Sequence, residues 1–271
     1  MIRPRASART INKLLDVQMI KLRTLVLLLA LAPAATLADD YRFEARASFT
    51  RDMPEFDVPV GDPEVLSLSG TWYFAPVATD GVPLSEAAFL GRASYVGAIA
   101  ARFELFDTHL DAQAASIGYY FPGTMLFAGA GVSRSEQVIA LNSTTRLTDH
   151  FTQWFGTLGI APIDGLLITT DLGEGGYDPN LRARHVGRLP NSHFYAGSVS
   201  IVDPDEGDTS IGVDFDYFLD DSTSVGAGYQ DGPDRLEVRA ERFFSGSWAA
   251  GVSAYTADGS DGFGVFIKWR H

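Results

Sequence analysis

The chain has 271 residues, of which 46% are hydrophobic and 20% are charged, so it is long enough for one large domain and too apolar to be disordered. It contains no cysteine, which excludes a disulfide scaffold, a thiolate zinc site and a cysteine nucleophile. Its formal net charge is -13, and so acidic a chain is a poor partner for the phosphate backbone of nucleic acids.

The first 38 residues predict an export signal rather than part of the fold. Met19 opens a stretch with two basic residues, an unbroken apolar run follows over 25–31, and Ala38 places a small residue where a signal peptidase cuts. The apolar run is shorter than the about 20 residues that a membrane-spanning helix needs. We therefore predict a signal peptide region over 1–38, with Met19 as the true start, and a mature chain over 39–271.

Alternating apolar and polar residues recur from Tyr41 to the end of the chain. Because successive side chains of a strand point to opposite faces, each such run predicts a strand with one apolar and one polar face. The clearest runs are 41–50, 66–74, 94–106, 210–220, 235–244 and 262–271, and weaker runs lie near 111–121, 125–133, 151–160, 165–172, 181–189, 193–202, 223–230 and 248–257. Together they predict about fourteen strands, within a range of about twelve to sixteen, each close to the roughly ten residues of a barrel strand.

The predicted connections alternate in length. Short turns follow the even-numbered strands at 122–123, 163–164, 190–191, 220–221 and 246–247, and longer or more acidic links follow odd-numbered strands at 51–65, 134–149, 173–180 and 203–208. Short turns on one side and longer loops on the other are typical of an outer-membrane barrel, and an even number of strands returns both termini to the periplasmic side. A soluble β-sandwich has no reason to keep this alternation.

One link after an even-numbered strand is long, over residues 76–93. Pro83 stands just before residues 85–90, and this order predicts a turn or two of helix, because proline is favoured in the first turn. Such a helix is either a connection at the periplasmic mouth of the barrel or a small plug in the lumen. We favour the connection, because links of this length usually have structure of their own.

The polar phase of the strands carries many charged side chains. On a soluble sandwich they would form the solvated outer face, whereas in a barrel they would line the lumen and the apolar phase would meet lipid. For the barrel, the predicted pore-lining residues are Arg42, Glu44, Arg46, Arg102, Glu104, Asp214, Asp216, Arg235, Glu237, Arg239, Glu241, Lys268 and Arg270. The residues predicted to face lipid in the run 210–220 are Ile211, Val213, Phe215, Tyr217 and Leu219. The aromatic residues near strand ends, predicted to form girdles at the membrane interfaces, are Trp72, Tyr73, Phe74, Phe243, Phe244, Trp248 and Trp269.

The chain shows no established pattern for catalysis or metal binding. Its histidines lack metal-ligand spacing, and a Gly-x-Ser-x-Gly nucleophile elbow is absent. We therefore predict no enzyme, no metal and no cofactor, although His150 or His193 paired with a serine or an aspartate would mark a barrel lipase or protease. The acidic, glycine-containing segments 203–208 and 257–262 lack the closing glutamate of a calcium loop and are more typical of solvated loops.

Residues 73–96, YFAPVATDGVPLSEAAFLGRASYV, resemble a segment of a family of porins from Gram-negative bacteria. That family pairs a strand ending in Tyr-Phe-x-Pro-Val with the turn Pro-Leu-x-Glu-Ala-Ala-Phe-Leu-x-Arg-Ala-Ser, and residues 165–171, GLLITTD, are similar to it as well. The resemblance implies an outer-membrane β-barrel that acts as a passive channel and has no catalytic residues. His271 departs from it, because outer-membrane barrels usually end in phenylalanine.

These observations predict an all-β fold, a single transmembrane antiparallel up-and-down β-barrel, located in the bacterial outer membrane after export through the periplasm. The predicted function is passive diffusion of small hydrophilic solutes or ions. The expected partners are therefore outer-membrane lipid and these solutes, without nucleic acid, and a homo-oligomer is compatible with the sequence. Two alternatives remain open: a barrel enzyme of the lipase or protease type, and a soluble extracellular β-sandwich that binds a ligand.

Overall fold

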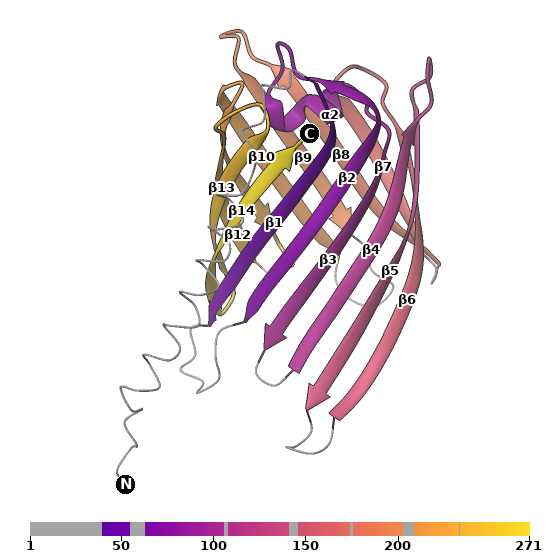
Figure 1. Cartoon of the computed structure of the whole chain (residues 1–271), viewed down its shortest axis with the longest axis vertical. Helices are drawn as coiled ribbons and strands as arrows, with labels where there is room; N and C mark the ends of the chain where they lie inside the picture. The colour runs from indigo at the N-terminus through magenta and orange to yellow at the C-terminus, as the bar shows by residue number, and fades with distance from the viewer. Residues whose placement is uncertain are drawn as a thin grey trace, which may run out of the picture. The chain divides into compact units, whose positions relative to one another are not determined.

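The computed structural model describes residues 40–54, 63–105, 108–140, 146–173, 176–202, 209–232 and 234–271. The predicted signal peptide region, 1–38, and the acidic segment 203–208 lie outside the described residues. Within them, fourteen antiparallel strands, each paired with its neighbours in the chain, close into a barrel where β14 pairs with β1 (Figure 1). This confirms the predicted all-β fold, its up-and-down order and its number of strands. None of the helices in the described part of the chain has the length and hydropathy of a transmembrane segment.

The strands vary in length, and two helical turns interrupt them. The strands are β1 (Asp40–Pro54), β2 (Glu64–Ala78), β3 (Tyr95–Leu105), β4 (Thr108–Tyr120), β5 (Leu126–Ala140), β6 (Arg146–Ile160), β7 (Leu166–Gly173), β8 (Gly176–Arg188), β9 (Phe194–Val202), β10 (Ser210–Asp220), β11 (Thr223–Gln230), β12 (Arg235–Phe243), β13 (Trp248–Ala257) and β14 (Ser260–Arg270). A 3-10 turn, η1 (Leu84–Glu86), and the short helix α2 (Ala87–Leu90) lie between β2 and β3. The predicted turn or two of helix in the link 76–93 is therefore confirmed.

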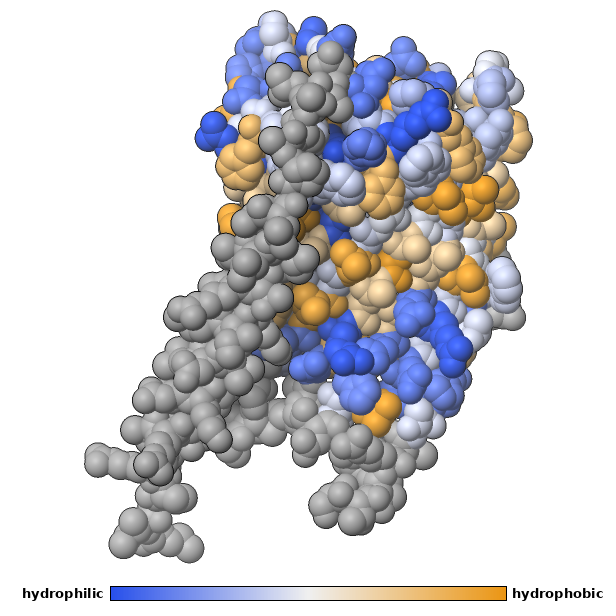
Figure 2. Space-filling model, in the orientation of Figure 1, coloured by the Kyte–Doolittle hydropathy of each residue, from blue (hydrophilic) through white to orange (hydrophobic). Residues whose placement is uncertain are grey.

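Strand pairing shows which of the two faces of each strand, the apolar or the polar one, lies on the outside of the barrel. Val213 of β10 pairs with Val199 of β9 and with Tyr229 of β11, and all three side chains are exposed. The next residue along β10, Asp214, is instead held by Arg239 of β12, on the opposite face of the sheet, at 2.8 Å. The apolar phase therefore covers the outer surface and the polar phase faces the interior. Figure 2 shows the outer surface as an apolar band with hydrophilic side chains above and below it.

β5 and β6 extend further than the sequence predicted. Most described residues of the segment 134–149, predicted as a link, belong to these two strands, and the predicted link 173–180 overlaps the start of β8. In Figure 1, β5 and β6 project beyond the other strands at the end opposite α2. This projection carries polar side chains on its outer face, as in the contact of Glu136 Oε2 with His150 Nδ1 at 3.5 Å. Alternation alone does not mark where the apolar band ends, so the sequence did not indicate this extension.

Residues 79–94, here called the mouth segment, fold across one open end of the barrel. Ala87 packs with Tyr41, Tyr73 and Val77 on the β1–β2 side. The side chains of Phe89 and Leu90 reach the other side, where they pack against Val186, Ala196 and Phe218 of β8 to β10. Figure 1 shows α2 between the strand ends, beside the C-terminus. The sequence left open whether this link lies at the mouth or enters the barrel, and its contacts with both sides place it inside the mouth.

Gly165, in the turn between β6 and β7, is expected to tolerate no side chain. Its φ is +73°, and a Cβ there would collide with the carbonyl oxygen of Val186, whose N–H donates to the Gly165 carbonyl at 2.7 Å. Gly123, in the turn between β4 and β5, has nearly the same φ, +72°, but open space around it. We expect Gly165→Ala to lower the free energy of unfolding by about 1–3 kcal/mol more than Gly123→Ala does, because only the first adds an overlap to the backbone strain. Urea unfolding in lipid vesicles measures both, and equal losses would contradict this account.

Candidate functional site in the barrel interior

The inner surface of the barrel has two chemically different halves. Along β3 to β6, the inward positions within 95–103, 112–120, 127–135 and 151–159 carry small, hydroxyl, amide, aliphatic and aromatic side chains and no charge. Charged side chains recur at the inward positions of β10, β12, β14 and β1. The sequence predicted the charged half, because those strands alternate charged with apolar residues, whereas the uncharged half carries apolar residues on both faces.

Most of the predicted pore-lining residues share the inner face. The strand register places on it Glu44, Arg46, Asp214, Asp216, Arg235, Glu237, Arg239, Glu241, Lys268 and Arg270. Arg42 differs, because it lies at the register shift between Tyr41 and Phe43, where its side chain is exposed and its N–H donates to the His271 carbonyl at 2.8 Å. The structure therefore brings together a group of inward charges that come from four strands.

Arg102 and Glu104 are placed on the outer face, and this corrects the sequence-based assignment. Arg102 pairs across the strands with Leu66, an exposed outward residue, and its Nε lies 2.6 Å from Asp111. Ile99, which belongs to the apolar residues of the same run, is on the inner face, where it pairs with Ser69. Both charged residues lie near the end of β3 away from the mouth segment, where outward charges stand clear of the apolar band. A period of two tells which residues share a face and not which face is inside.

The aromatic girdle prediction also needs a partial correction. Trp72, Phe74 and Phe244 are exposed on the outer surface, as a girdle requires. Tyr73 and Phe243 are buried and point inward, because Tyr73 packs under the mouth segment and Phe243 lies beneath the Arg270 guanidinium at 4.6 Å. Aromatic residues at strand ends therefore pack inside the mouth of the barrel as well as on its outer surface.

The charged half of the interior is organised as ion pairs. Arg239 bridges two carboxylates, since its Nη1 lies 2.8 Å from Asp214 and its Nη2 lies 2.8 Å from Asp216. The other pairs are Lys268 with Glu241 (2.8 Å), Arg270 with Glu44 (2.6 Å) and Arg235 with Glu237 (2.9 Å). These contacts join four cations to five carboxylates, so this half presents both signs side by side and its net charge is small.

Glu86 connects the mouth segment to the wall of the barrel. Its two carboxylate oxygens accept hydrogen bonds from Nη2 of Arg184 on β8, at 2.6 and 2.8 Å, and its side chain is almost completely buried. Burial raises the pKa of the Glu86 carboxyl, and the neighbouring Arg184 guanidinium opposes that rise. A pair in this setting holds position well, because breaking it leaves a buried charge without a partner.

Two further contacts hold the mouth segment at other points of the rim. The Leu84 carbonyl accepts a hydrogen bond from Arg270 Nη1 at 2.6 Å, and the Leu84 N–H donates to the Asp221 carbonyl in the β10–β11 turn at 2.8 Å. Arg92 Nη2 donates to the Ala161 carbonyl, beside the β6–β7 turn, at 3.2 Å. The segment is thus fixed to strands that are far apart in the barrel, and it narrows this opening.

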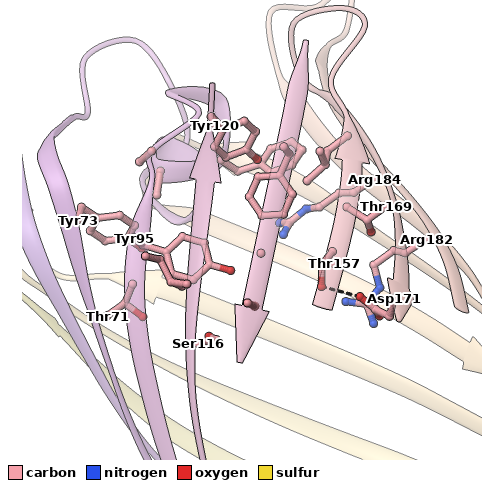
Figure 3. Close-up of a pocket in the computed structure, with 18 of the residues that line it drawn as sticks. Thr71, Tyr73, Tyr95, Ser116, Tyr120, Thr157, Thr169, Asp171, Arg182 and Arg184 are labelled. Atoms are coloured by element: carbon pink, nitrogen blue, oxygen red, sulfur yellow. Dashed lines mark hydrogen bonds between the residues drawn. The ribbon is translucent and has the colours of Figure 1, made fainter. Parts of the chain in front are cut away.

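Next to the mouth segment the interior holds a cavity of about 540 Å³ (Figure 3). Aromatic rings from β2 to β4, among them Tyr73, Tyr95 and Tyr120, form one side, and Asp171 of β7 and Arg182 of β8 lie on the other. A cavity of this size lies within the range of about 300–1,000 Å³ that is usual for small-molecule sites. Its combination of ring faces, hydroxyls and single charges suits a small solute that is polar at one end.

Sequence reasoning missed the charged residues of this cavity. Their strands alternate weakly, and β7 reads as an apolar run that ends in Asp171. The only signal was the spacing of Arg182 and Arg184, which are two residues apart and therefore share a face of β8. That signal does not reveal the partner of Arg184, because Glu86 is 98 residues away in the chain.

The histidines considered as catalytic candidates make other contacts. His150 lies on the outer face beside Glu136, and Nδ1 of His193 lies 2.9 Å from the Phe218 carbonyl oxygen while its ring stacks on Tyr217. In the part of the chain that the structure describes, no three histidine or acidic side chains gather closely enough to hold a metal ion. The segment 203–208 lies outside the described residues.

A closed antiparallel barrel with an outward apolar band and a polar inner face has the architecture of an outer-membrane β-barrel, and the chain is placed in the bacterial outer membrane. Among solved structures it is similar to the Acinetobacter baumannii outer membrane protein Omp33, with a TM-score of 0.69 and 19% identity over 86% of this chain and 99% of that one. It is also similar to a deltaS2S3 mutant of TodX, described as a monoaromatic hydrocarbon channel, with a TM-score of 0.51 and 9% identity over 89% and 91% of the two chains. No family model and no curated protein matches the sequence.

Proposed function

We propose that this barrel is an outer-membrane channel for the passive diffusion of small hydrophilic solutes or ions. The observation that carries the proposal is the polar inner face, on which charged side chains from β1, β10, β12 and β14 converge on a common interior. Charged groups on the lumen side of a barrel keep water and ions there, while the outward apolar phase contacts lipid. Contact with membrane lipid and with small solutes is therefore part of the proposed function.

The mechanism is steric and electrostatic. The ion pairs hold long side chains in fixed positions, so they set the width of the water-filled path. Because Arg239 lies between Asp214 and Asp216, and Lys268 beside Glu241, both signs line the path, and we expect weak preference between cations and anions. The mouth segment limits the size of the solutes, since it lies across one opening and is held there by Glu86 and its other contacts.

A cysteine placed on either face of β13 tests the channel, because the natural chain has no cysteine. Ser253 pairs with Arg239 and Gly264 on the inner face, and its neighbour Val252 is exposed on the outer face. We expect single channels of Ser253→Cys to conduct KCl in a planar bilayer and to lose current stepwise when a cationic thiol reagent is added. Channels of Val252→Cys should not respond, because that side chain contacts lipid.

The chain without an introduced cysteine is the control, because it shows whether the thiol reagent changes the current by reacting at any other side chain. A heat-dependent gel shift confirms that each variant has folded before its current is measured. A folded barrel that carries no current, or equal responses from the two cysteine variants, would refute the proposed channel.

A further inference from the structure

The cavity next to the mouth segment contains one unmatched charge of each sign. Arg184 is neutralised by Glu86. Arg182, on the same face of β8, has no ion-pair or hydrogen-bond partner among the described residues. Asp171 accepts a hydrogen bond from Thr157 Oγ1 at 2.7 Å and has no cationic partner in the same described part of the chain. Figure 3 shows Arg182 and Asp171 together on one side of the cavity.

The strand register places these two groups close to each other without making them direct cross-strand partners. Arg182 stands opposite Thr169, and Asp171 stands opposite Asn180, so the two charges are diagonal neighbours on β8 and β7. Backbone positions in that relation are about 7–8 Å apart. The guanidinium and the carboxylate both face the cavity, and no ion pair joins them among the described residues, so each is available to one charge of a ligand that carries both signs.

The rest of the cavity is suited to an apolar body. Tyr95 and Tyr120 face it, together with Phe127 and Phe155 of β5 and β6. The Tyr120 and Phe127 rings lie 4.7 Å apart, centre to centre, and form a continuous aromatic surface. Apolar or aromatic groups pack favourably on such rings.

We propose that this cavity binds the zwitterion of an α-amino acid with an apolar side chain: the carboxylate on Arg182, the ammonium on Asp171, and the side chain on the aromatic wall. A guanidinium matches a carboxylate with two parallel hydrogen bonds, and a carboxylate accepts from an ammonium. A simple anion bound at Arg182 would lie close to the negative charge of Asp171. A simple cation bound at Asp171 would lie close to the positive charge of Arg182. The inference rests on the proposed channel function, since the cavity would lie on the diffusion path.

The experiment compares three ligands with the same ring. The chain, extracted in detergent from the membranes of an expressing strain, is titrated calorimetrically with L-phenylalanine, with phenylethylamine, which lacks the carboxylate, and with 3-phenylpropionate, which lacks the ammonium. We expect phenylalanine to bind at least about tenfold more tightly than either analogue, because each analogue loses one charge-assisted contact. Equal binding of one analogue, or no binding of phenylalanine, overturns the proposal without any variant.

Two variants then assign the charges. Arg182→Gln should reduce the affinity for phenylalanine about tenfold and should not reduce that for phenylethylamine, which has no carboxylate. Asp171→Asn should reduce the affinity for phenylalanine about tenfold and should not reduce that for 3-phenylpropionate, which has no ammonium. Arg134→Gln, which removes the same charge from the outer face, should change neither affinity. Unchanged phenylalanine affinity in both cavity variants contradicts the assignment.

Conductance in KCl, measured on the same preparations, separates this inference from the channel. Current without phenylalanine binding refutes the amino-acid site and leaves the channel standing. Binding without current refutes the channel and supports the site.

Discussion

Replacing Val213 with arginine is expected to lower the free energy of unfolding by about 2–4 kcal/mol, the cost of a charge on the lipid face near the middle of the bilayer. Val213 lies in the middle of β10, between Val199 and Tyr229 on the outer surface. An arginine there would place its charge among apolar side chains of the outer surface. Denaturant unfolding of the barrel in lipid vesicles measures the loss.

The matched control places the same residue on the inner face. Ser67 of β2 faces inward between Ser48 and Ala101, on the lumen side of the wall. Ser67→Arg should cost much less than Val213→Arg, because its guanidinium stays hydrated. If the two arginines cost the same in lipid, the assignment of the faces is wrong. In detergent the contrast should shrink, because a micelle adapts more easily to a charge.

Removing the Arg270 side chain is expected to have a comparable effect at the mouth. Arg270 is 2% exposed, its Nε lies 2.6 Å from Glu44, and its Nη1 donates to the Leu84 carbonyl at 2.6 Å. Its guanidinium also stacks over the Tyr41 ring, at 4.3 Å. Arg270→Ala leaves a carboxylate and a carbonyl without their donors, so we expect a loss of about 3–5 kcal/mol in the free energy of unfolding.

Two further variants show whether this loss comes from the contacts. Arg270→Lys keeps the charge and one donor, so it should recover part of the loss. Arg42→Ala removes an exposed arginine from the same end of the barrel and should cost less than about 0.5 kcal/mol. Similar losses in Arg42→Ala and Arg270→Ala would show that net charge, and not the buried contacts, explains the effect.

The fold was predictable because a barrel repeats one simple pattern. Each hairpin requires only alternation and a turn, so strand number and order could be read locally. The inner charges of β10, β12 and β14 followed from the same alternation. Arg102 was misplaced because β3 belongs to the uncharged half, where Ile99 faces inward and the apolar phase no longer marks lipid. Pattern alone does not reveal that reversal.

The candidate site was less predictable because it depends on contacts that are distant in sequence. Glu86 reaches Arg184, and Leu84 reaches Arg270, only once the mouth segment has folded inward. The charges left unmatched in the cavity, Arg182 and Asp171, are defined by that arrangement. No run of neighbouring residues encodes which charges will be paired. The residue types could therefore be read from the sequence, but their ion-pair partners could not.

The contacts of the mouth segment also tie its docking to the order of assembly. Leu84 is held by Arg270 on the last strand and by Asp221 between β10 and β11, although the segment itself follows the second strand. Early in folding only its contacts with β1 and β2 are available, and the contact of Leu84 with Arg270 forms when β14 arrives beside β1. Such long-range contacts form late. A docked mouth segment is thus a signature of a completed ring, because an unclosed sheet cannot supply both of its partners.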